Sequence, residues 1–150
     1  MRTQILFFII VISFMTSCRP VHKEPAEFTN NEWNTTEKVN FRLSIEDPGE
    51  YDINVKVYYT DQMQGTYFAI GLMLKAPFGE ERYLERSEKI FKNGEATGEK
   101  NKEGYYVYEM ELFKEINCVE EGVYKFEAQS LMPTHTVKGI HKLELLVKPV

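Results

Sequence analysis

The sequence predicts an all-β protein, an antiparallel β-sandwich of the jelly-roll or Ig-like kind with about seven or eight strands. Apolar and polar residues alternate along several stretches, and Gly and Pro separate these stretches from one another. Beyond the N-terminal apolar run, no stretch has a convincing helical period. The order of the strands within the sheets does not follow from this pattern.

The alternation is clearest in two neighbouring stretches. Every second residue from Val39 to Ile45 is apolar, and the same holds from Tyr51 to Tyr59. Asp47-Pro48-Gly49-Glu50 lies between them and predicts a turn, so we expect the two strands to pair as a hairpin. All the large apolar side chains then lie on one face, which requires a second layer to cover it.

The rest of the chain continues the same pattern. Thr66 to Lys75 is more continuously apolar and predicts a central strand, in which Gly71 marks a bulge. Tyr83 to Phe91 mixes charged and apolar residues and favours an edge strand. Asn93 to Gly104 has three glycines and no period, which predicts a long solvent-exposed loop. Further strands are expected at 105–112, 123–128 and 140–147.

The N-terminus is typical of an export signal. The apolar run from Ile5 to Met15 is shorter than the roughly 20 residues that a membrane-spanning helix needs, and Arg2 precedes it. Met15-Thr16-Ser17-Cys18 resembles a bacterial lipobox, in which the cysteine thiol accepts a diacylglycerol. We therefore expect 1–17 to be a lipoprotein signal peptide and Cys18 to carry acyl chains that hold the mature protein on a membrane.

A polar segment follows the lipobox. Residues 18–34 show neither helical nor strand periodicity, so they are interpreted as a lipidated tether, and 35–150 as the sandwich domain. Lys23-Glu24 is either part of a surface-export signal or simply a charged stretch of tether. Trp33, the only tryptophan, stands where the tether ends, and either closes the edge of the core or stacks on a ligand.

No pattern of catalytic or metal-binding residues emerges from the sequence. The net charge of -5, with no dense run of Lys and Arg, argues against nucleic-acid binding. His135 and His141 are six positions apart with Gly139 between them, which is poor spacing for a metal site. Cys118 is interpreted as a buried, inert thiol without a disulfide partner. We expect a protein that is not an enzyme and needs no cofactor.

Aromatic residues are the remaining candidates for binding. Trp33, Tyr58, Tyr59 and Tyr67 are selected as candidate contacts for a ligand or partner, because rings near loops can stack on sugars. Packing within strands is the competing explanation, since sheets favour aromatic residues for packing alone.

Two stretches carry a resemblance to a known family. The first runs from Trp33 to Tyr59 and includes Asp47-Pro48-Gly49-Glu50-Tyr51. The second is Gly122-Val123-Tyr124-Lys125-Phe126-Glu127-Ala128-Gln129, followed by Met132 and Lys138-Gly139-Ile140. Together with the lipobox, these resemble the gliding-motility lipoprotein GldH family.

This resemblance implies a non-enzymatic outer-membrane lipoprotein, an accessory of gliding motility or of the associated protein-secretion machinery. It implies envelope proteins as partners and supplies no catalytic residues. The side of the outer membrane, periplasmic or cell-surface, stays open. The alternative is a surface glycan-binding sandwich that uses the aromatic residues, and a small hydrolase is a third class.

Overall fold

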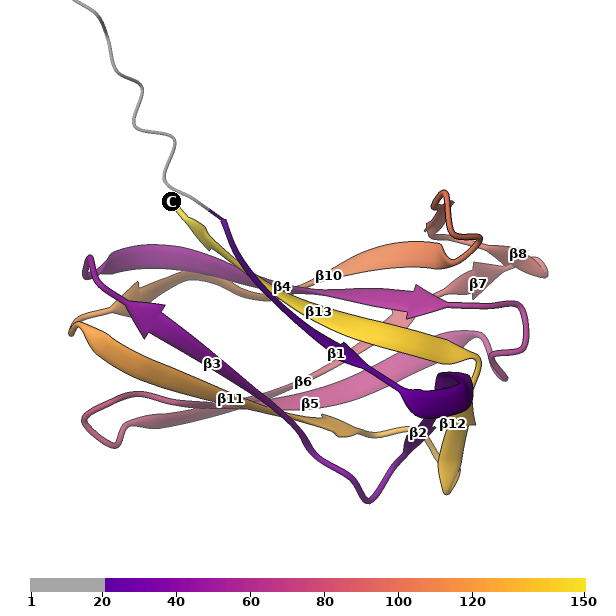
Figure 1. The fold of residues 1–150 in the computed structure, drawn as a ribbon, viewed down its shortest axis with the longest axis horizontal. Helices are drawn as coiled ribbons and strands as arrows, with labels where there is room; N and C mark the ends of the chain where they lie inside the picture. The colour runs from indigo at the N-terminus through magenta and orange to yellow at the C-terminus, as the bar shows by residue number, and fades with distance from the viewer. Residues whose placement is uncertain (1–20) are drawn as a thin grey trace, which may run out of the picture.

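The computed structural model describes residues 21–150. The expected signal peptide and the lipidation site at Cys18 lie outside the described residues. Antiparallel sheets pack against each other as a sandwich (Figure 1), which confirms the predicted fold class. The helical content of residues 21–150 is a single 3-10 turn, η1 (Thr29–Asn31), so no helix there is long and apolar enough to cross a membrane.

Two main sheets form the sandwich. The five-stranded sheet has the order β1-β13-β4-β10-β9 and the four-stranded sheet the order β3-β11-β5-β6. The strands of the first are β1 (His22–Glu27), β4 (Gly49–Tyr59), β9 (Glu99–Lys100), β10 (Tyr106–Cys118) and β13 (Ile140–Pro149). Those of the second are β3 (Val39–Ile45), β5 (Tyr67–Lys75), β6 (Glu81–Lys89) and β11 (Gly122–Ser130). Two short pairs complete the fold: β2 (Glu32–Asn34) with β12 (Thr136–Lys138), and β7 (Phe91–Lys92) with β8 (Glu95–Ala96).

The core lies between the two sheets. Alternate side chains of β3, β4 and β11 point inward and are almost fully buried, as the alternation in the sequence predicts. Phe41, Val55 and Phe126 are at most 1% exposed. Burial of an apolar side chain of this size contributes roughly 1.5–3 kcal/mol, so the two facing layers provide the main stabilisation of the fold.

The predicted hairpin between 39–45 and 51–59 is wrong. β3 pairs with β11, whereas β4 pairs with β10 and β13 in the other sheet. The turn that contains Asp47 and Pro48 carries the chain from one layer to the other. Both strands have one apolar face, and these faces are buried equally well side by side or opposite each other. Alternation therefore cannot distinguish the two arrangements.

The predicted tether is wrong over residues 22–34. β1 pairs with β13 along six residues, and β2 pairs with β12, so within residues 21–150 the segment before residue 35 already contributes strands to the sandwich. β1 is the edge of its sheet, and most of its side chains face solvent, which explains its polar sequence. Pro25 lacks a backbone N–H and is tolerated because only one side of an edge strand is paired.

Gly71 does not form the predicted bulge, since β5 pairs with both neighbours in continuous register. A Cβ there would lie 2.5 Å from the hydroxyl oxygen of Tyr83, so glycine leaves room for the tip of that ring. The expected loop at 93–104 contains the short strands β8 and β9. β6 is an edge strand, as predicted.

Gly139 forms the corner between β12 and β13. Its φ is +79°, and a Cβ would lie 2.4 Å from the backbone nitrogen of Met63. Its carbonyl accepts a hydrogen bond from Thr60 N–H at 2.8 Å. The backbone conformation and the close approach both require glycine here.

Candidate functional site

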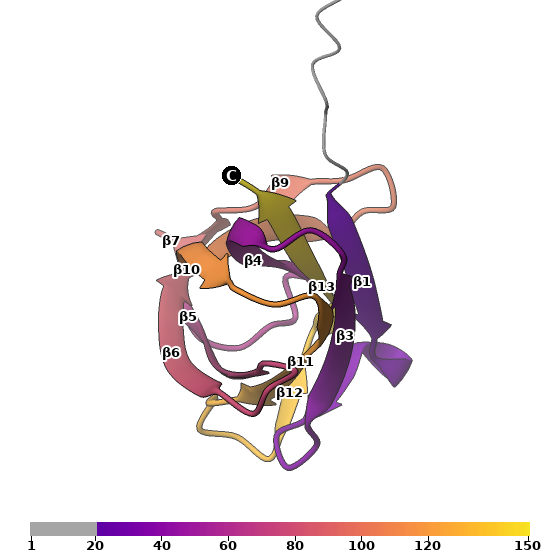
Figure 2. The ribbon, with the colours of Figure 1, turned by 90° about the vertical axis from the view of Figure 1, so that its left-hand side faces the viewer.

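The edge strands β1 and β3 border an opening between the two sheets. They belong to different sheets and run beside each other along one side of the sandwich (Figure 2), where the chain enters the domain. We call this opening the seam pocket; its volume is about 350 Å³. It is lined by His22, Lys23, Glu24, Arg42, Leu43, Ser44, Glu46, Leu145 and Val147.

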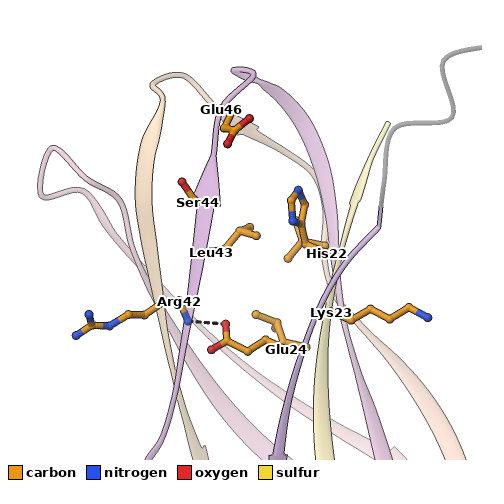
Figure 3. Close-up of a pocket in the computed structure, with 9 residues that line it drawn as sticks. His22, Lys23, Glu24, Arg42, Leu43, Ser44 and Glu46 are labelled. Carbon is orange, nitrogen blue, oxygen red and sulfur yellow. Dashed lines mark hydrogen bonds between the residues drawn. The ribbon is translucent and has the colours of Figure 1, made fainter.

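The seam pocket combines an apolar floor with an acidic wall. Leu43, Leu145 and Val147 are at most 7% exposed and form the floor. His22 and Glu24 extend from β1 into the space between the strands (Figure 3), because alternate side chains of a strand share one face. The charged ends of the other two basic residues, Lys23 and Arg42, point away from that space. The carboxylates of Glu24 and Glu46 therefore dominate its charge.

Glu24 connects the two sheets. Its Oε2 accepts a hydrogen bond from the backbone N–H of Arg42 at 2.8 Å. A bond from a backbone amide to a carboxylate is stronger than one between neutral groups. An inward-pointing charge on an edge strand also discourages unintended strand pairing. Glu24 thus occupies the free edge of β3 at Arg42 and closes one end of the seam pocket.

Ser44 and His22 share the pocket lining but do not form a nucleophile and base pair. Ser44 lies between the buried Leu43 and Ile45, so its side chain points to the outer face of the sheet. Figure 3 shows its hydroxyl on the side of β3 that faces away from His22. The Ser44 hydroxyl is therefore not held against the His22 imidazole, and the seam pocket offers surfaces for binding contacts.

Trp33 and Tyr59 lie in the core. Both are 0% exposed. Trp33 stacks on Phe28 with ring centroids 5.0 Å apart and donates its indole N–H to the carbonyl of Glu37 at 3.0 Å. Tyr59 donates its hydroxyl to the carbonyl of Ile90 at 2.8 Å. Neither ring offers a face to a ligand in this structure.

Tyr58 and Tyr67 lie on opposite outer faces of the sandwich and therefore cannot share one site. The Lys142 ammonium stands 4.1 Å from the centre of the Tyr58 ring, and Glu144 accepts a hydrogen bond from its hydroxyl at 3.2 Å. Burial, and then the charge of Glu144, raise the pKa of Tyr58. Tyr67 is 49% exposed, with the Lys89 ammonium 5.5 Å from its ring centre.

Cys118 and His141 are held by packing and hydrogen bonding within the sandwich. Cys118 is 3% exposed, and burial raises the pKa of its thiol. The imidazole of His141 stacks on Tyr105 with ring centroids 4.0 Å apart, and its Nδ1 lies 2.9 Å from Oδ1 of Asn31. Across residues 21–150, no three His, Cys, Asp or Glu side chains are grouped as ligands of a metal ion would be.

Sequence reasoning missed the seam pocket because β1, β3 and β13 are far apart in the chain. Lys23-Glu24 was interpreted as part of a surface-export signal or as a charged stretch of tether, and neither interpretation indicates a pocket. One available signal was the alternation at His22, Glu24 and Ala26, which puts three residues on one face of a short strand.

Neither a protein-family model nor a curated protein matches this chain.

Proposed function

We propose that this chain is a non-enzymatic lipoprotein that binds another envelope protein through the seam pocket. The observation that carries the proposal is the position of that pocket beside His22, the first residue of the first strand. Only residues 19–21 separate His22 from Cys18, the residue expected to be lipidated. Four extended residue steps span at most about 14 Å, so the pocket lies close to the membrane surface.

The membrane is the bacterial outer membrane in this proposal. The lipobox at Met15-Thr16-Ser17-Cys18 supports a lipid anchor, and the resemblance to the GldH family supports the location and the kind of partner. The partner is then a component of the gliding machinery or of the associated protein-secretion machinery. A binding role also agrees with the lining of the pocket, where an apolar floor lies beside carboxylates.

Site-specific photocrosslinking in native membranes tests the proposal. A crosslinking amino acid replaces His22, whose side chain extends into the seam pocket. In a matched control it replaces Ser87, an exposed residue of β6, which is the edge of the four-stranded sheet opposite to β3. We expect a discrete protein adduct from position 22 that position 87 does not give. Equal products at both positions, or no protein adduct at position 22, would contradict a pocket-directed partner.

The anchor has its own test. Cys18→Ala should move the protein from the membrane fraction to the soluble fraction, because the acyl chains supply the membrane affinity. If the variant still fractionates with membranes, the anchor assignment is wrong. The crosslinked partner can then be sought with the soluble variant, which separates the anchor from the binding site.

Glycan binding is the second candidate, on a different surface. Tyr67 and Tyr83 are 49% and 51% exposed and lie on the outer face of the four-stranded sheet. Exposed tyrosine rings can stack on sugars. Tyr67→Ala and Tyr83→Ala should then each weaken retention on polysaccharide, whereas Tyr58→Ala on the other outer face should not. Unchanged retention of both variants removes this candidate.

A further inference from the structure

The free edge of β3 faces the seam pocket. β3 pairs only with β11, so the other side of its backbone is not paired with a strand, although β1 runs beside it. The N–H of Arg42 points to that free side, because it donates to Glu24 of β1. Backbone groups of an antiparallel strand alternate in direction, so the N–H and C=O of Ser44 point the same way. Both therefore face the seam pocket.

Other parts of the two facing edges are protected. Pro25 removes a donor from the free side of β1, and Glu24 occupies the N–H of Arg42. Beyond Arg42, toward the turn at Asp47, β3 and β1 diverge (Figure 3), and Ser44 is one of the residues that line the pocket there. This end of β3 can accept a further strand.

The lining specifies what such a strand carries. The buried floor of Leu43, Leu145 and Val147 fits an apolar side chain. Glu46 stands at the mouth, and Asp47 follows it as an exposed residue in the turn. The complementary segment is extended, with an apolar residue facing the floor and Lys or Arg beside it.

We propose that an extended basic segment of the partner protein adds to the free edge of β3 at Ser44. Its backbone pairs with the N–H and C=O of Ser44, one side chain fills the floor of the seam pocket, and a neighbouring basic side chain meets Glu46. This inference rests on the proposed function and names the chemistry by which the partner is recognised.

The test uses a display library of linear 12-residue peptides, selected against the full-length lipidated protein in detergent micelles. We expect the enriched peptides to alternate apolar and basic residues and to bind more weakly as salt rises. Ser44→Pro removes the N–H on the free edge and should weaken their binding about tenfold, since a hydrogen bond of this kind is lost and a ring obstructs pairing. Ser44→Ala, which changes only the side chain, should bind like the wild type.

A second variant separates charge from backbone pairing and covers the case in which Ser44→Pro fails to fold. Glu46→Lys leaves the backbone intact and should also weaken binding about tenfold. Its matched control is Glu95→Lys in β8, at the far end of the sandwich (Figure 1), which should have no effect.

Three results overturn strand addition: no enriched peptide, enriched peptides without basic residues, or enriched peptides that bind a folded Ser44→Pro variant as well as the wild type. The peptides are selected without reference to the crosslinked partner. A protein adduct at position 22 together with any of these results keeps the proposed function and rejects only this mode of recognition.

Discussion

Tyr59 holds a distant segment of the chain against the core, and Tyr59→Phe measures how much this contributes to stability. Its hydroxyl donates to the carbonyl of Ile90 at 2.8 Å and accepts from the N–H of Gly98 at 3.0 Å. The ring itself packs edge-on against Phe91 with centroids 5.5 Å apart. The substitution removes one oxygen atom and leaves the packing of the ring in place.

The two partners of that oxygen respond differently. The carbonyl of Ile90 also accepts from the N–H of Thr97 at 2.9 Å, so it keeps a partner. The N–H of Gly98 loses its acceptor in a partly buried place. A hydrogen bond contributes about 1 kcal/mol net, and a donor left without a partner adds a penalty of similar size. We therefore expect the free energy of unfolding to fall by about 2 kcal/mol.

Urea unfolding followed by tryptophan fluorescence measures this change. Trp33 is the only tryptophan and is 0% exposed, so its emission reports the loss of the core. The midpoint should fall by about 1 M urea. Tyr67→Phe on the surface should change stability by less than about 0.5 kcal/mol. Equal effects of the two substitutions would refute the structural role assigned to the Tyr59 hydroxyl.

Three further predictions concern stability and reactivity. Gly139→Ala should lower the free energy of unfolding by about 3 kcal/mol or more, because the position has a positive φ and the added Cβ clashes with backbone. Gly79→Ala is the control: its φ is +96° but the space around it is open, so the loss should be only about 1 kcal/mol in the same urea assay. Burial opposes ionisation of Glu109, but hydrogen bonds led by that from Lys148 outweigh it and lower its pKa. The stability that ionised Glu109 contributes is therefore lost as pH falls through that lowered pKa. This contribution to the free energy of unfolding is less than about 1 kcal/mol, because the pair is partly exposed. Glu109→Gln should remove this part of the pH dependence in urea titrations across acidic pH. Cys118 should react with iodoacetamide only in urea, because burial excludes the reagent and raises the pKa of the thiol; rapid labelling of the native protein would contradict its buried position.

The elements of the fold could be predicted because alternation reports directly which side of a strand is buried. From Tyr51 to Tyr59 the apolar positions of the sequence are the buried positions of β4. Partnership between strands could not be predicted in this way. β3 and β4 have the same pattern that a hairpin would have, although the chain crosses to the other sheet at Asp47-Pro48.

The candidate site was harder to predict than the fold. Trp33 and Tyr59 are aromatic residues near chain turns, and both ligand-binding residues and core residues are found in such positions. Their complete burial in the structure assigns them to the core. The segment from His22 to Glu27 reads as a linker because an edge strand buries few side chains. Its inward-pointing Glu24 acquires a role only when β3 lies beside it.

The sequence by itself determined what depends on neighbouring residues in the chain. This includes the apolar faces of the strands, the expectation of export and of a lipid on Cys18, and the all-β class. The tertiary structure decided what depends on residues brought together from a distance. It placed His22, Leu43 and Leu145 around one pocket, because three strands from separate parts of the chain meet where the edges of two sheets lie side by side. Periodicity specifies which face of a strand is apolar, but the pairing of strands specifies which faces and edges meet.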